Sequence, residues 1–259
     1  MEECVMSYVT KKGAGAIESA TTEKQDFSKA IKSLKSGTAF KVRVPSAEEV
    51  VEVFIHSVYE VFYSTPCTRD DLYDKAVELL YADAKKANEA GDEKGAEALR
   101  RHAYALKAKP RYLFGFINLE DGEPMIIDLS KKQAQGVIAT IKKYEKRLDQ
   151  LAFEISKTGK GQSTTVGFNP LMFLEEDLTP QELKHFNESA GKAIDDEVYE
   201  NCLYVKKPAE QAEDIIAYER KNKGLNLAER LGLDDIANAG EPEDVLQEID
   251  EQEERNYGF

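Results

Sequence analysis

The last nineteen residues, 241–259, most strongly limit what this chain can fold into. They hold eight carboxylates against one arginine, and only Val245, Leu246 and Ile249 offer aliphatic side chains to a core. Such a segment cannot bury enough apolar surface to offset the entropy lost on ordering, so we expect a solvated acidic tail. A phenylalanine at position 259 gives this tether an apolar anchor for a basic, apolar pocket on a partner. Composition alone supports a purely solubilising tail equally well.

The charge of the chain is divided unequally along its length. The net charge is −14, but residues 172–259 hold 24 acids and 9 bases, whereas residues 1–171 hold 25 acids and 26 bases. The first two thirds could therefore carry a basic groove. The last third is a polyanion that could compete with an anionic ligand for that groove.

The cysteines and the hydropathy pattern indicate the compartment. Cys4, Cys67 and Cys202 are odd in number and far apart, which predicts no disulfide framework. No apolar run approaches the length of a membrane span, and the first residues do not resemble a signal peptide. We therefore expect a reducing cytoplasm and no membrane contact.

Hydrophobic periodicity separates strands from helices. Phe40, Val42 and Val44 alternate with Lys41 and Arg43, as in a half-buried strand. Further apolar or alternating runs lie at 50–63, 111–119, 124–129, 151–156 and 164–168. Helical spacing predicts a helical hairpin over 70–106 and a helix over 130–149.

Without the inserted hairpin, the order of elements is strand, strand, strand, helix, strand, strand. This is the order of the five-stranded OB-fold barrel, so we expect a mainly β fold with α insertions. The expected divisions are a flexible arm over 1–36, an OB-fold core over 37–171 with a helical insertion at 70–106, an acidic, patchily helical region with only weak satellite structure over 172–240, and an acidic tail over 241–259, the C-terminal region being partly disordered.

OB barrels bind single strands along a basic groove, with bases stacked on aromatic side chains. The cations expected to hold the backbone are Lys41, Arg43, Lys109, Arg111, Lys157 and Lys160. For base stacking, Tyr112 is favoured because it lies beside several cations, while Phe114 and Tyr59 are weaker candidates. Phe114 and Phe116 fit the barrel core equally well, because alternation does not reveal which face is wet.

A metal site finds less support. His56 and Cys67 are eleven residues apart where the helical insertion begins, but a structural zinc site needs four ligands and usually a close cysteine pair. No Cys-x-x-Cys motif is present, and Asp70, Asp71 and Asp74 suit a helix N-terminus. We expect no metal and no other cofactor.

Catalytic motifs are also lacking. The sequence contains no glycine-rich phosphate loop after a strand and no Gly-x-Ser-x-Gly elbow, and His102 and His185 stand alone. We do not expect an enzyme. A metal-dependent nuclease ranks below the binding functions because no clustered carboxylates support it.

The ordered combination of several segments resembles the single-stranded DNA-binding (helix-destabilising) proteins of tailed bacteriophages. The segments are the strand at 41–44, the block HSVYEVFYSTPCTRDDLYD, the hairpin RYLFGFINLEDGEPMIIDL and the acidic tail with its terminal phenylalanine, and the similarity covers residues 36–171 and the tip of the tail. The resemblance implies an OB fold that coats exposed DNA strands during replication, recombination and repair. It also implies an acidic C-terminus that recruits polymerase, helicase or recombination proteins and closes the DNA groove when DNA is absent.

The resemblance carries over to particular residues. The tail would bind replication proteins through Asp250, Glu251, Glu253, Glu254 and Phe259, and self-association on DNA is compatible with it. Some members of the family have a zinc-bound insertion, of which His56 and Cys67 look like a remnant. The later cysteine pair is missing here, which favours a metal-free insertion.

The sequence thus predicts binding of single-stranded DNA without sequence specificity. The alternative is a protein-binding adaptor or scaffold with an OB-like barrel and no nucleic-acid role. Basic and aromatic residues on one face of the barrel would distinguish the two, because an adaptor does not need them.

Overall fold

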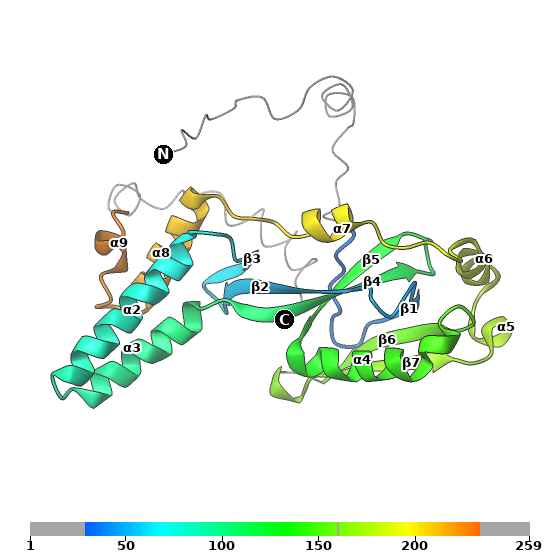
Figure 1. Cartoon of the computed structure of the whole chain (residues 1–259), viewed down its shortest axis with the longest axis horizontal. Coiled ribbons are helices and arrows are strands. Elements are labelled where there is room, and N and C mark those ends of the chain that lie inside the picture. Colours follow the sequence, from blue (N-terminus) through cyan, green and yellow to red (C-terminus); the bar gives the residue numbers. More distant parts are fainter. Residues whose placement is uncertain (1–28, 160, 234–259) are drawn as a thin grey trace, which may run out of the picture.

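The computed structural model describes residues 29–159 and 161–233, which form a mixed α/β structure around a seven-stranded antiparallel sheet (Figure 1). The strands are β1 (Ala39–Arg43), β2 (Val50–Val58), β3 (Phe62–Pro66), β4 (Lys109–Asn118), β5 (Pro124–Ser130), β6 (Ala152–Thr158) and β7 (Thr165–Leu171). Their order is β3-β2-β4-β1-β6-β7, and β5 pairs with β4. β4 is the centre of the sheet, because it pairs with β2 along its first half, with β1 near its end and with β5 along most of its length.

The helices begin where the sequence supplies caps. They are α2 (Leu72–Glu89), α3 (Glu93–Leu106), α4 (Lys131–Tyr144), α5 (Leu174–Asp177), α6 (Pro180–Glu188), α7 (Asp196–Asn201), α8 (Pro208–Lys221) and α9 (Leu227–Arg230), with 3₁₀ turns η2 (Glu145–Arg147) and η3 (Gly161–Ser163). Asp71 and Asp92 cap α2 and α3 by accepting backbone hydrogen bonds, and Ser130 forms a capping box with Gln133 at α4. The helical hairpin expected over 70–106 is confirmed as α2 and α3.

The main core lies between the inner face of the sheet and α4. Phe114 and Phe116 of β4 point into it, with Phe153 of β6 and Phe168 of β7. The ring centroids of Phe153 and Phe168 are 4.9 Å apart, and those of Phe116 and Phe168 are 5.6 Å apart. These stacked aromatics join β4 to the β6–β7 hairpin across the core.

The sheet remains open. Among the described residues no pairing joins β5 to β7, and α4 packs against both strands. The expectation of a mainly β fold is wrong, since helices make up much of the insertion and of the C-terminal region.

Residues 172–203, which we call the belt, run across the outer face of the sheet. Leu178 and Phe186 of the belt are buried against Leu119 of the β4–β5 turn and Ala152 of β6. Ile194, Val198 and Cys202 are buried against the outward side chains of β4 and β5 in a further cluster. The expected weak satellite structure is therefore wrong for this segment, because its widely spaced apolar residues pack fully.

A separate core joins the insertion to the C-terminal helices. Tyr73 and Leu80 of α2 are completely buried, as is Ile215 of α8 in the same cluster. The Tyr73 hydroxyl donates a hydrogen bond to Asp214, which also pairs with Lys206 at 3.0 Å. Figure 1 shows α2, α3, α8 and α9 together at the end of the molecule away from α4, β6 and β7.

The described part of the N-terminal arm is packed rather than flexible. Ile31 forms a parallel bridge with Ile126 of β5, and Leu34 is buried in the main core. The expectation of a flexible arm is thus wrong for residues 29–36. None of the described helices is long and apolar enough to span a membrane.

Candidate functional site

The cations predicted on β1 are covered by the belt. Lys41 Nζ lies 2.9 Å from a carboxylate oxygen of Glu182 and donates to the carbonyl of Asp177 at 2.7 Å. Arg43 is only 4% exposed and donates to the carbonyl of Phe186 at 2.7 Å, with its guanidinium 4.5 Å from the centre of the Phe186 ring. Burial lowers the pKa of Arg43, and the charge of Asp149 opposes this effect. In this conformation neither side chain is open to a phosphate, so the structure corrects their predicted role.

The belt also covers the outer face of β4 and β5. A Cβ atom added at Gly115 of β4 would lie 1.9 Å from the hydroxyl oxygen of Tyr199, so glycine is required for this close approach. That hydroxyl donates to Glu49 at 2.8 Å, and burial together with this hydrogen bond raises the pKa of Tyr199. The neighbouring outward residues Leu113 and Ile117 are buried under the belt.

Two predicted cations come together from different strands. Arg111 at the start of β4 donates from Nε and Nη2 to the two carboxylate oxygens of Asp128, at 2.8 and 3.0 Å. Lys157, near the end of β6, is half-buried; burial and the positive charge of Arg111 lower its pKa, while Asp128 acts in the opposite direction. Two cations thus share one carboxylate at this place, which leaves it suited to an additional anion.

The predicted aromatic residues differ in accessibility. The Tyr112 hydroxyl donates to Glu52 at 2.7 Å on the surface. Phe114 and Phe116 are completely buried, so the core interpretation is correct for both and Phe114 has no surface for a base. Tyr59, in the turn between β2 and β3, is 70% exposed.

Lys109 leads to an aromatic residue that the sequence prediction missed. Its Nζ lies 5.0 Å from the ring centre of Tyr104 on α3, and Tyr104 is 64% exposed. The spacing of Ala96, Ala103 and Leu106, which face α2, could have shown that Tyr104 points outward. Phe54 of β2, 51% exposed, was also missed; strand alternation assigns it a face but gives no measure of exposure.

Some predicted residues lie outside the described part of the chain. They are Lys160 and the tail residues Asp250, Glu251, Glu253, Glu254 and Phe259.

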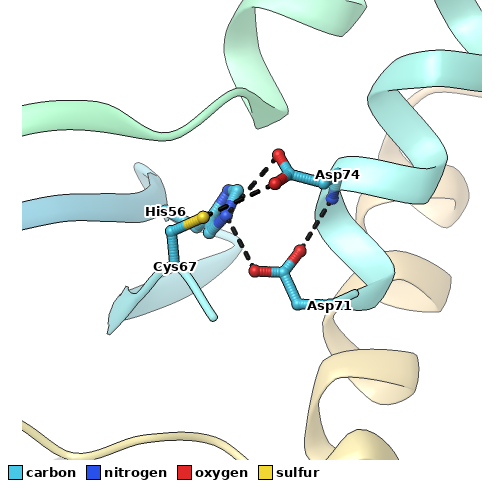
Figure 2. Close-up of side chains that lie close together, drawn as sticks. All are labelled: His56, Cys67, Asp71 and Asp74. Atoms are coloured by element: carbon cyan, nitrogen blue, oxygen red, sulfur yellow. Dashed lines mark hydrogen bonds and ion pairs between the residues drawn. The ribbon is translucent and has the colours of Figure 1, made fainter. Parts of the chain in front are cut away.

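A second polar cluster lies where β2, β3 and α2 meet (Figure 2). His56, Cys67, Asp71 and Asp74 each offer one donor atom within 4.8 Å of the others. His56 is fully buried, with Nδ1 2.8 Å from the carbonyl of Leu106 and Nε2 3.2 Å from Oδ2 of Asp71. The Nε2 contact has ion-pair distance without hydrogen-bond alignment, so Nε2 has no hydrogen-bond partner.

Electrostatics define the metal-free form of this cluster. Burial alone would lower the pKa of His56, but Asp71, the Leu106 carbonyl and Asp74 outweigh burial and raise it. Burial and the carboxylates of Asp74 and Asp71 raise the pKa of the Cys67 thiol to about 12. Imidazole, thiolate and carboxylate are all zinc ligands, so the four side chains could hold a zinc-type cation after Cys67 and His56 lose their protons. Without a metal, the protonated His56 pairs with Asp71 and ties β2 to the N-terminus of α2.

Comparison with family models, curated proteins and solved structures found no match to this chain. Its function must therefore be inferred from its own residues and geometry.

Proposed function

We propose that this protein binds single-stranded DNA without sequence specificity, at the start of β4 and the end of β6. The observation that carries the proposal is the convergence of Arg111 and Lys157 around one carboxylate, next in sequence to Tyr112. Two neighbouring cations with a single counter-charge favour an anionic ligand, and a nearby tyrosine can stack on a base.

The strand pairing supports this location. If β1 and β2 are taken as one interrupted first strand, the pairings β2–β4, β4–β5, β1–β6 and β6–β7, with α4 between β5 and β6, follow the OB-fold order. OB folds bind oligonucleotides on strands two and three and on the loops between strands one and two and between strands four and five. In this chain those elements are β4, β5, the connection containing α2 and α3, and the β6–β7 connection.

Arg111 retains capacity for a phosphate while it pairs with Asp128. A guanidinium has five N–H donors, and the two hydrogen bonds to Asp128 leave three. Lys157 supplies a second positive charge, and Tyr112, with Tyr59 more distant, offers a ring to a base. Binding should weaken as salt rises, because the cations displace counterions condensed on the DNA.

The cellular role follows from the resemblance described above. DNA coating in replication, recombination and repair, and recruitment of replication proteins by the acidic tail, are part of the proposal on that basis. The proposal no longer includes Lys41, Arg43 or Phe114 as DNA contacts.

The test is fluorescence anisotropy of a labelled oligo-dT strand at about 50 and about 200 mM salt. We expect Lys157→Met to weaken binding roughly five- to tenfold, as for one lost charge-assisted contact, and to reduce the salt slope by roughly 0.7. Lys192→Met in the exposed part of the belt is the matched control and should leave both unchanged. Absence of binding by the wild-type protein at low salt would refute the proposal.

The adaptor alternative is favoured by one observation. Met172 and Phe173, at the turn between β7 and α5, are 49% and 66% exposed, and adjacent exposed apolar side chains suit a protein contact. The anisotropy titration decides between the two functions, since an adaptor would not bind oligo-dT.

A further inference from the structure

We propose that α3 carries a second stretch of the DNA interface, which continues from Lys109 along the helix. The surface consists of Arg100, Arg101, Tyr104 and Lys107, and we call it the α3 stripe. This inference rests on the proposed function and extends it to a helix to which the sequence gave no binding role.

The α3 stripe is a basic surface in an acidic protein. Residues 98–109 contain four cations and no acid, although the whole chain has a net charge of −14. Every member of the stripe is exposed. Steps of three or four residues separate Tyr104 from Arg100, Arg101 and Lys107, so all four lie on one side of the helix.

The cations of the stripe are available to a ligand. Within the described chain, no ion pair or side-chain hydrogen bond involves Arg100, Arg101 or Lys107. By contrast, Lys41 and Arg111 each have a carboxylate oxygen within 3 Å, at 2.9 and 2.8 Å respectively. A structural arginine normally has an internal acceptor, whereas these arginines have only solvent.

Tyr104 connects the stripe to the proposed site. Its ring is 64% exposed and receives the Lys109 ammonium at 5.0 Å, which leaves ring surface for a base. Lys109 and Arg111 are two positions apart on β4 and point to the same side of the strand. A strand of DNA could therefore pass from Arg111 over Lys109 and Tyr104 to the arginines of α3.

The arrangement in space agrees with a single path. In Figure 1 the α2–α3 hairpin projects from the start of β4, at the opposite end of that strand from β1. The path would run along the length of the molecule, away from the face covered by the belt. The stripe has an aromatic residue between cations and no large aliphatic side chain, which fits a nucleic acid better than a membrane or an apolar protein surface.

The test compares two charge reversals of equal size. Arg100→Glu/Arg101→Glu changes the stripe, and Lys142→Glu/Lys146→Glu changes two exposed cations at the end of α4 and in η2. Each variant is titrated with oligo-dT of about 6 and about 20 nucleotides, lengths that span the range of OB-fold site sizes. Tyr104→Ala tests stacking separately, and thermal melting checks that each variant is folded.

We expect the stripe variant to bind the long oligonucleotide at least tenfold more weakly and the short one nearly as well as the wild type. Its salt slope on the long oligonucleotide should fall by roughly 1.4, since two phosphate contacts are lost. Tyr104→Ala should weaken binding to the long oligonucleotide at least fivefold. The control should change either affinity less than about threefold, through long-range charge alone.

The outcomes separate this inference from the proposed function. If the wild-type protein binds neither oligonucleotide, both fall. If it binds and the stripe variants match it, or if the α4 control loses as much as the stripe variant, the inference alone is overturned. Should the double charge reversal melt early, Arg100→Gln/Arg101→Gln gives the same test with a smaller expected loss.

Discussion

Replacement of Gly115 by alanine tests whether the belt packs directly on the outer face of β4. The new methyl group would be placed 1.9 Å from the hydroxyl oxygen of Tyr199 and 2.9 Å from a side-chain carbon of Ile194. Neither distance is compatible with van der Waals contact, so Tyr199 must move and lose its hydrogen bond to Glu49.

The expected cost follows from these two effects. Overpacking of a well-filled interior costs about 1–3 kcal/mol, and a hydrogen bond to a charged group contributes about 1.5–3 kcal/mol. Gly115 is not among the residues with positive φ, so its backbone accepts alanine, which regains about 0.4–1 kcal/mol through the unfolded state. We expect Gly115→Ala to lower the free energy of unfolding by about 2–4 kcal/mol.

The assay is a double-mutant cycle by urea denaturation. In a Tyr199→Ala background the added methyl has space, and only the adjustment of Ile194 remains, so Gly115→Ala should cost less than about 1 kcal/mol. The coupling energy should therefore be about 2 kcal/mol. An equal cost of Gly115→Ala in both backgrounds would refute packing of the belt against this strand.

Three further results are expected. Arg43→Met should lower the free energy of unfolding by about 2–4 kcal/mol in urea denaturation, because the hydrogen bond to the Phe186 carbonyl and the contact with its ring are lost, and should leave oligo-dT affinity unchanged; a loss of affinity without a loss of stability would contradict the buried placement. His56 has a raised pKa in the folded protein, so its stabilising contribution is complete below the unfolded value of about 6.5 and disappears as pH rises through the folded pKa. With EDTA present, the melting temperature should fall over this range more in the wild type than in His56→Asn, and an increase with pH would indicate a metal instead. Deletion of residues 241–259 should tighten binding to oligo-dT at low salt, since it removes eight carboxylates that compete with DNA, and an unchanged affinity would exclude autoinhibition by the tail.

Local patterns in the sequence were sufficient for most elements. The strand at Ala39–Arg43, the α2–α3 hairpin and the capping box at Ser130 each depend on residues close in sequence, and each was predicted near its observed position. Alternation also showed that Lys41 and Arg43 share a face opposite Val42. It could not show that another segment covers that face.

The belt escaped prediction because its apolar residues are sparse. Leu178, Phe186, Ile194 and Val198 are four to eight residues apart among acids, and such spacing forms no continuous amphipathic pattern. Their burial depends on long-range contacts with β4, β5 and β6. The cluster around His56 was likewise only half visible, because Asp71 and Asp74 could be identified as helix N-terminal acids but not as neighbours of a buried imidazole.

The energetics of the belt decide which part of the sheet remains for DNA. Four buried side chains of the belt, Leu178, Phe186, Ile194 and Val198, each contribute about 1.5–3 kcal/mol by leaving water, so removal of the belt would cost on the order of 6–12 kcal/mol. Exposure of Lys41 and Arg43 to phosphates would return about 1.5–3 kcal/mol each. The belt therefore stays in place when DNA binds, and the strand must use the surface that the belt leaves open, at the start of β4 beside Lys157 and α3.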